Sequence, residues 1–513
     1  MASAGPAHHS YDLDPTQKLL VTVGVIAGML MQVLDTTIAN VALPHMQESL
    51  GATRDTISWV LTSYIVASAI AIPITGWLSD RMGRKPLFIW SVSAFTVASL
   101  LCAIATSLEE IVIFRALQGV AGAFLVPLAQ STMLDINPPE KHARAMAVFG
   151  MGVMIGPILG PVVGGYLTDN YNWRWVFLIN LPVGVLAAAL MFYGLPDTQK
   201  VRRPFDLFGF TLIALALGGL QLMLDRGEQN DWFSSWETII ELGVTIAGTW
   251  MFLVHMVTSQ RPIFDPPIFR DRNFVASLVF MGITGVMLLA GLALLPPLLQ
   301  SLFGYSVLQS GFLTAPRGIG TLVSMLIVGR LLGKVDARLI ILLGTCLMAI
   351  SLWQMSGFSL EMDSRPIIVS GVIQGFALGC IFVPLNTLAF GTLDQRYRTT
   401  GAALLNLSRN VGGSIGISVV TVLLARNAQI SHSDLAAHIT PYSIPQFLTN
   451  VVNAAPGVTD MAVAMVDAEV NRQALMIAYI DDFRLMMIIS LCSIPLILLL
   501  RRARGAGGPA VMD

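Results

Sequence analysis

Residues 19–44 read LLVTVGVIAGMLMQVLDTTIANVALP, an apolar run that contains one acid, Asp35. A helix needs about 20 apolar residues to cross a bilayer, so this run is long enough to span one. A carboxylate inside hydrocarbon is costly, and ionisable groups at such depth usually lie on an ion or substrate path. We therefore expect Asp35 to be functional. The alternative is a polar residue that only hydrogen-bonds a neighbouring helix and assists packing.

The rest of the chain has the composition of an all-α polytopic membrane protein. Of its 513 residues, 55% are hydrophobic and 12% are charged, whereas about 25% of the residues in soluble proteins are charged. The apolar residues form long blocks, unlike the short alternating segments of a membrane β-barrel. Fourteen spans are expected near residues 18–43, 56–76, 86–105, 110–133, 144–168, 176–196, 206–224, 238–257, 274–298, 309–331, 337–357, 366–390, 401–425 and 482–500.

Lysine and arginine residues predict the orientation of these spans. Of 30 such residues, 20 fall in one set of alternating loops and three, Arg115, Arg317 and Arg409, fall inside spans. The other set of loops holds only Arg54, Arg174, Arg226, Arg365, Arg426, Arg472 and Arg484. Because basic residues accumulate in cytoplasmic loops, both termini are expected in the cytoplasm.

The spans divide into a front set of six, an insertion and a back set of six. We expect a cytoplasmic tail at 1–17, a front bundle at 18–196, a linker with two additional spans at 197–262, a back bundle at 263–503 and a second cytoplasmic tail at 504–513. The back bundle includes a long outer loop, 427–481. The second half of this loop is rich in helix-forming residues and is expected to extend the last helix outward.

A charged motif, GWLSDRMGRKPLF, follows the second span at residues 76–88. Its glycines permit a tight turn between two helices, and its charges could latch one bundle to the other or only fix the topology. The residues expected to form this gate are Gly76, Asp80, Arg81, Gly83, Arg84 and Lys85.

Arg115 lies inside the fourth span, at a depth comparable with that of Asp35. A buried arginine needs an acceptor, and Asp35 is the expected one, either directly or through Gln118 or water. A change in the distance between the two groups would change how firmly the carboxylate holds a proton. The alternative is a static structural ion pair.

The fifth span contains glycines at every fourth position and two prolines. Such a face permits close helix packing, and the prolines add bends within the same face. We expect a moving interface formed by Gly152, Gly156, Pro157, Gly160, Pro161, Gly164 and Gly165.

Other polar residues inside spans are candidates for lining a substrate cavity. They are Gln32, Thr36, Asn40, Gln118, Arg317, Asn406 and Arg409. The four cysteines lie in apolar spans without a CxxC partner, so no metal site is expected. GRLLGK (329–334) lacks one residue of a P-loop, and no nucleophile motif is present. We expect no enzyme, no cofactor and no nucleic-acid partner, so an ion gradient must drive any uphill transport.

These motifs resemble the major facilitator superfamily, in particular its fourteen-span drug:proton antiporters. LDTTIANVALP (34–44) resembles the first-helix motif of that branch, GWLSDRMGRK the loop motif, FRALQG the fourth-helix motif and GPVVGG the antiporter motif of helix five. LDRGEQNDWFSS (224–235) and RPIFDPPIFRDRNF (261–274) resemble the EmrB-like multidrug exporters within the branch.

The resemblance implies two six-helix bundles that rock around a central cavity, with the two additional helices at the periphery. It implies that Asp35 is the protonation site, that Arg115 is its coupling partner, and that Asp80 with Arg84 forms an inner gate. The substrates would be hydrophobic or amphipathic drugs, exported across the inner membrane at the expense of the proton gradient. The partners would be a periplasmic adaptor of the EmrA type and an outer-membrane channel of the TolC type, with 427–481 as a candidate contact. The back-half counterpart of the loop motif, GRLLGKVDARL (329–339), departs from the family pattern.

Two other functions remain open at this stage. One is a carrier for a specific metabolite, lipid or siderophore, which would need a cavity with many fixed polar groups. The other is a receptor or assembly subunit that does not transport and would not need Asp35.

Overall fold

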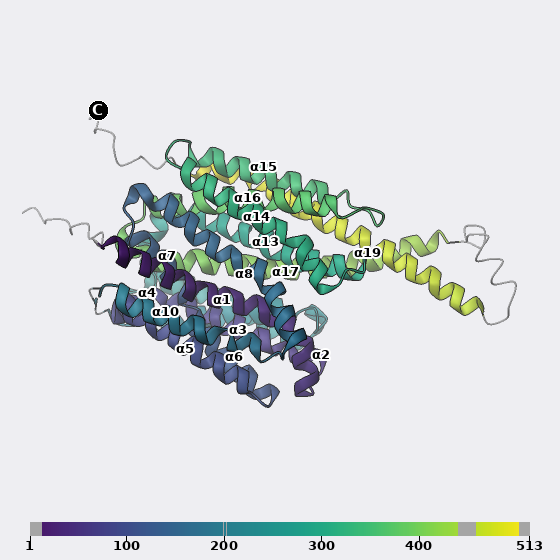
Figure 1. The fold of residues 1–513 in the computed structure, drawn as a ribbon, viewed down its shortest axis with the longest axis horizontal. Helices are drawn as coiled ribbons and strands as arrows, with labels where there is room; N and C mark the ends of the chain where they lie inside the picture. Colours follow the sequence, from purple (N-terminus) through teal and green to yellow (C-terminus); the bar gives the residue numbers. More distant parts are fainter. Residues whose placement is uncertain (1–12, 199, 202, 440–457, 502–513) are drawn as a thin grey trace, which may run out of the picture.

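Long helices lie side by side along one direction in the computed structural model, which describes residues 13–198, 200–201, 203–439 and 458–501 (Figure 1). Fourteen helices of these residues are long and apolar enough to cross a membrane, in agreement with the predicted number of spans. The fold is that of two six-helix bundles with two additional helices. The exact residues at which the bundles begin and end stay a prediction.

The front bundle contains six spans, several of which are interrupted. Its helices are α1 (Pro15–Leu50), α2 (Arg54–Ile57), α3 (Trp59–Ala71), η1 (Ile72–Ile74), α4 (Thr75–Met82), α5 (Arg84–Ile104), α6 (Leu108–Gly122), α7 (Leu125–Asp135), η2 (Pro139–Lys141), α8 (His142–Asn170), α9 (Trp175–Leu178) and α10 (Asn180–Gly194). Proline lies at two of the interruptions, because Pro73 is within η1 and Pro127 is in the first turn of α7. A proline has no N–H to bond the preceding turn, so a continuous helix is disfavoured there.

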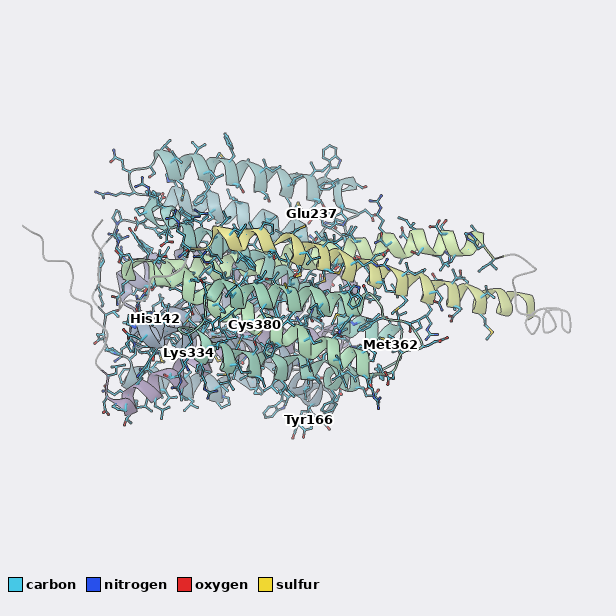
Figure 2. The ribbon with its side chains drawn as sticks, turned by 90° about the horizontal axis from the view of Figure 1, so that it is seen from above. His142, Tyr166, Glu237, Lys334, Met362 and Cys380 are labelled. Atoms are coloured by element: carbon cyan, nitrogen blue, oxygen red, sulfur yellow. The ribbon has the colours of Figure 1, made fainter. Side chains whose placement is uncertain are left out.

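The two additional helices are α11 (Leu207–Arg226) and α12 (Trp236–Thr258), with η3 (Trp232–Ser234) between them. They pack on each other, and α11 also contacts α3 and the back-bundle helix α17. Figure 2 shows α12, which carries Glu237, at the outer edge of the molecule. Trp250 and Val257 of α12 are exposed, as expected for side chains that face lipid.

The back bundle contains the longest helices. Its elements are η4 (Pro266–Arg270), α13 (Arg272–Ser301), α14 (Val307–Leu331), α15 (Ala337–Met355), α16 (Arg365–Gly391), η5 (Gln395–Tyr397), α17 (Arg398–Ala437), α19 (Val458–Cys492) and η6 (Ile494–Leu499). The starts of α1 and α17 and the end of α19 lie at the same end of the molecule (Figure 1).

The outer loop predicted at 427–481 is helical on both sides. The expected extension of the last helix is confirmed, because α19 begins at Val458. In addition, α17 continues to Ala437, well beyond the expected span end at 425, a continuation that was not predicted. The remainder of this loop, 440–457, lies outside the described residues.

The two bundles contact each other mainly through α8 with α14 and α16, and through α4 and α7 with α17. The contacts of α4 and α7 lie toward the end of the molecule where α1 and α17 begin (Figure 1).

Candidate functional site

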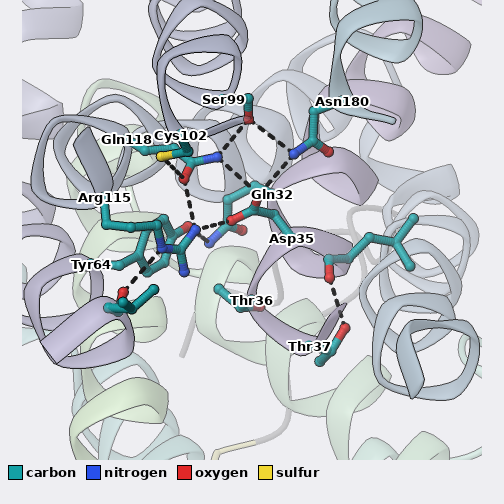
Figure 3. Close-up of polar contacts among 12 residues, drawn as sticks. Gln32, Asp35, Thr36, Thr37, Tyr64, Ser99, Cys102, Arg115, Gln118 and Asn180 are labelled. Atoms are coloured by element: carbon teal, nitrogen blue, oxygen red, sulfur yellow. Dashed lines mark hydrogen bonds and ion pairs between the residues drawn. The ribbon is translucent and has the colours of Figure 1, made fainter. Parts of the chain in front are cut away.

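Asp35 lies on α1 and is fully buried inside the front bundle. Arg115 donates a hydrogen bond from Nη1 to Asp35 Oδ2 at 2.5 Å. Gln118 Nε2 and Asn180 Nδ2 donate to the other oxygen, Oδ1, at 2.9 Å and 2.7 Å. Figure 3 shows these donors converging on the carboxylate from α6 and α10. Three donors on one carboxylate satisfy its charged form in a place that water does not reach.

The Arg115 guanidinium is held on several sides. Its Nε donates to the carbonyl oxygen of Val60 at 3.1 Å, and Nη1 also donates to Gln118 Oε1 at 2.7 Å. The guanidinium carbon lies 4.3 Å from the ring centroid of Tyr64 and 5.6 Å from that of Phe177. Cations are attracted to the faces of aromatic rings. These contacts fix the position of the charge that faces Asp35.

Sequence reasoning missed three members of this cluster. Asn180 binds Asp35 directly, and Ser99 Oγ accepts hydrogen bonds from Gln118 and Asn180 at 2.6 Å and 3.0 Å. Tyr64 contacts Arg115 and accepts a hydrogen bond from Gln32 at 3.0 Å. Asn180, an amide near the start of an apolar span, is the one signal that could have been used, because buried polar groups need partners.

A cavity of about 480 Å³ lies between the bundles. α1 and α8 of the front bundle and α13, α14 and α16 of the back bundle contribute its wall. Of the predicted cavity residues, Asn40 and Arg317 lie in the wall, and so do Pro157 and Pro161 of the glycine-rich helix. Asp35 does not line this cavity.

The structure places the other predicted cavity residues elsewhere. Gln32 hydrogen-bonds Tyr64, Gln118 belongs to the Asp35 cluster, and Thr36 Oγ1 donates to the carbonyl oxygen of Val33 on its own helix at 2.8 Å. Thr37, the neighbour of Thr36, lies in the wall instead.

Arg409 is also absent from the cavity wall. It lies where α17 crosses α13, with its backbone against Gly285. Its Nη1 is buried and has no hydrogen-bond partner among the described residues.

Asn406 joins the two bundles instead of lining the cavity. Its Nδ2 donates to Gln130 Oε1 on α7 at 2.8 Å, and Gln130 Nε2 donates to Asn386 Oδ1 on α16 at 2.5 Å. All three side chains are buried. A fully paired polar cluster of this kind stabilises one arrangement of two packed surfaces.

The glycine-rich face of α8 packs on α1. A Cβ atom added to Gly152, Gly156 or Gly160 would overlap Met29, Val33 or Thr37, respectively, and Gly164 lies against Ile38. Thr37 Oγ1 donates to the carbonyl oxygen of Gly156 at 3.2 Å. In contrast, a Cβ on Gly165 would have no neighbour within 4 Å. The close contact therefore involves four of the five predicted glycines.

The two glycines of the loop motif differ in their role. Gly83 has φ +90° between α4 and α5, a conformation that favours glycine, so it forms the expected turn. Gly76 lies within α4, and a Cβ there would overlap Thr400 of α17. Gly76 therefore permits a close approach between the bundles and does not form the turn.

The charges of the loop motif meet partners that the sequence did not predict. Arg84 forms an ion pair with Asp135 of α7, and Arg398 Nη1 of α17 donates to the same carboxylate at 2.8 Å. Asp80 lies 3.8 Å from Arg203 Nε. The cations of the two remaining basic residues lie over aromatic rings: Arg81 over Trp77 and Lys85 over Phe192.

A second buried aspartate, Asp482, lies on α19 and was not predicted as a site residue. It is fully buried, and neither carboxyl oxygen has a hydrogen-bond partner among the described residues. It therefore contrasts with Asp35, whose oxygens accept three hydrogen bonds.

Comparisons with known proteins agree with this architecture. The sequence pattern of the Major Facilitator Superfamily matches residues 25–417. The chain is 34% identical over 500 residues to the multidrug export protein EmrB of Escherichia coli (strain K12), which covers 97% of this chain and 98% of that protein. It is 35% identical over 492 residues to the fatty acid resistance protein FarB of Neisseria gonorrhoeae, covering 95% and 97% of the two chains.

Among solved structures, the human organic anion transporter MFSD10 has a similar fold. Its TM-score is 0.60 at 15% sequence identity, and the match covers 93% of this chain and 100% of that chain. The superfamily match, the similar proteins and the shared fold thus all indicate a multi-pass membrane transporter and not an enzyme. The chain belongs to the major facilitator superfamily, in the fourteen-span branch that includes the EmrB-like exporters.

Proposed function

We propose that the chain is a proton-coupled antiporter that exports hydrophobic or amphipathic molecules, drugs among them, across the inner membrane, with both termini in the cytoplasm. The observation that carries this proposal is the position of Asp35 on α1. One face of α1 presents Asp35 to Arg115 inside the front bundle, and another face presents Thr37 and Asn40 to the cavity. A movement of this one helix affects both sites.

The proposed coupling follows from the charges of the cluster. A proton on Asp35 removes the negative charge that faces Arg115, and the protonated oxygen becomes a donor among groups that are themselves donors. The contacts that hold α1 against α6 and α10 weaken as a result. α1 then shifts along the glycine face of α8, and Thr37 moves relative to the cavity that it lines.

The alternation between two states uses the contacts between the bundles. Gln130, Asn386 and Asn406 hold the bundles together at one end, as does the pair of Asp135 with Arg398. The cavity lies toward the other end. Opening these contacts while the cavity closes exposes the substrate site alternately to the two sides of the membrane.

The partners we propose are a periplasmic adaptor of the EmrA type and an outer-membrane channel of the TolC type. The near-complete coverage of EmrB supports this part of the proposal. The helical extensions of α17 and α19 are the candidate contact surface, because they project beyond the other helices (Figures 1 and 2).

The test uses proteoliposomes with an imposed pH gradient and a lipophilic dye. Luminal pH and dye movement are followed together for the wild type, Asp35→Asn and the control variant Asp482→Asn. We expect opposite movement of dye and protons in the wild type, loss of both in Asp35→Asn, and retention of both in Asp482→Asn. Continued exchange in Asp35→Asn would exclude this residue as the coupling site. If the wild type moves neither dye nor protons with any of several substrates, the protein is a receptor or an assembly subunit.

A further inference from the structure

Among the described residues, the cavity wall contains a single charged one, Arg317 on α14. This side chain is only 7% exposed. Its Nη2 is buried without a hydrogen-bond partner, and no hydrogen bond or ion pair joins its guanidinium to another described residue. A guanidinium remains charged in proteins, so an unpaired one in this place carries a large desolvation cost.

A second unsatisfied group lies beside it. Gln374 on α16 is 1% exposed, and neither its Nε2 nor its Oε1 has a partner among the described residues. Both groups converge on Gly291, which also lines the cavity. A Cβ atom on Gly291 would lie 3.3 Å and 3.6 Å from the two terminal nitrogens of Arg317 and 3.6 Å from Nε2 of Gln374.

The rest of the wall around Gly291 is largely apolar. Leu288, Leu292 and Leu295 come from the same helix, followed by Pro296 and Pro297. The size of the cavity, about 480 Å³, is in the range of small-molecule sites, roughly 300–1,000 Å³. One charged donor group therefore stands in a wall that is apolar around Gly291 and has uncharged polar side chains elsewhere, Thr37 and Asn40 among them.

We infer that this cavity binds amphipathic anions, with the acidic head group on Arg317 and Gln374 and the apolar tail along α13. The guanidinium fork matches the two oxygens of a carboxylate, and the Gln374 amide supplies a further N–H donor. The inference rests on the proposed function, because it names the class of molecule that the exporter takes.

The experiment measures binding of radiolabelled decanoate to the purified protein in phosphatidylcholine nanodiscs, with empty nanodiscs subtracted. Decanamide, which has the same tail and no charge, is the neutral comparison. We expect decanoate to bind more tightly than decanamide, and Arg317→Gln to weaken decanoate binding by at least about tenfold while decanamide binding stays unchanged. Gln374→Leu should weaken decanoate binding to a smaller extent.

Arg409→Gln is the matched control, because Arg409 is also an arginine inside a span with a buried unpaired nitrogen but lies outside the cavity wall. We expect it to bind decanoate as the wild type does. Equal affinity of the wild type for decanoate and decanamide would overturn the inference, as would an equal loss in both arginine variants. Decanamide binding also shows that Arg317→Gln is folded. If Arg317→Gln does not fold, Arg317→Lys replaces it and should keep the preference for decanoate.

Two further comparisons separate the possible outcomes. Nanodiscs that contain phosphatidylglycerol reveal the source of the anion: unchanged decanoate affinity supports free amphiphiles, and competition supports lipid head groups with the same anionic chemistry. The binding assay uses no pH gradient, so Asp35→Asn should still bind decanoate. A wild type that binds decanoate but shows no antiport would contradict the proposed function and leave the anion site standing.

Discussion

Each bundle buries an arginine within the membrane, and the surroundings of the two are opposite. In the front bundle, Arg115 meets the Asp35 carboxylate, a backbone carbonyl and two aromatic rings. In the back bundle, Arg317 has no hydrogen-bond or ion-pair partner among the described residues and lies in the wall of a cavity. The same side chain is thus paired through Nε and Nη1 by its own chain in one place, where only Nη2 lacks a partner, and left open to a ligand in the other. This difference is the basis on which we propose coupling for Arg115 and ligand recognition for Arg317.

The largest effect, on thermal stability, is expected from Arg115→Met. Arg317→Met is the comparison. Arg115→Met leaves the Asp35 charge buried without its cation, which typically costs about 3–5 kcal/mol of stability. Arg317→Met removes no ion pair, so its melting temperature should stay at or above that of the wild type. Thermal unfolding of the purified proteins in one detergent provides the measurement. Equal destabilisation by the two changes would show that Arg317 has a structural partner after all.

The next effect concerns how α1 connects the Asp35 cluster with the cavity. Gly160→Leu forces a side chain into the position of Thr37, and overpacking typically costs about 1–3 kcal/mol. We expect it to abolish transport in proteoliposomes while decanoate still binds. Gly165→Leu is the control, because a Cβ at Gly165 meets no neighbour within 4 Å. Wild-type turnover in Gly160→Leu would mean that the α1–α8 contact does not move.

A smaller effect is expected at the polar cluster between the bundles. Gln130→Leu leaves Asn386 and Asn406 buried without their partner, at a typical cost of about 1–3 kcal/mol, and so favours states in which the bundles separate there. In a protein whose native cysteines are replaced, Thr400→Cys should react faster with a maleimide when Gln130→Leu is also present. Gln221→Leu is the control, because Gln221 bonds Ser414 of α17 from α11 and lies outside this cluster. An unchanged labelling rate would show that Gln130 does not hold this end closed.

The smallest effect on transport is expected from the outer hairpin, the segment 427–481, whose described residues supply no side chain to either arginine site. Residues 430–470 can be replaced by a short Gly/Ser linker, and proteoliposome transport should then match that of the wild type. Drug resistance of whole cells should fall if an adaptor docks on this region. An equal loss in both assays would indicate that the hairpin is needed for folding.

The sequence predicted the front arginine site better than the cavity. Asp35 and Arg115 are charged residues at comparable depth in apolar spans, and such charges need each other. Asn180 and Ser99 escaped prediction because uncharged polar residues are common in spans. Their meeting with Asp35 depends on how helices far apart in the chain pack.

The cavity depends on rotation about each helix axis, which span prediction does not provide. Successive helical residues point about 100° apart, since a turn holds about 3.6 residues. Thr37 therefore lines the cavity while Thr36 does not, and Asn406 faces Gln130 across the bundle contact. Arg317 lies in the wall, but its lack of a partner becomes visible only when every neighbouring helix is in position.

The long helices of the back bundle have a mechanical consequence. α17 comprises 40 residues, or about 60 Å, which is about twice the thickness of a bilayer core. Its outer part packs against α19, and His432 Nε2 lies 3.0 Å from Asp467 Oδ1 across this contact. The two helices α17 and α19 continue without a break from the membrane part of the back bundle and together form a lever arm. A small tilt of the bundle therefore becomes a larger sideways displacement at the outer ends of α17 and α19, so that a change of angle within the membrane produces a change of position outside it.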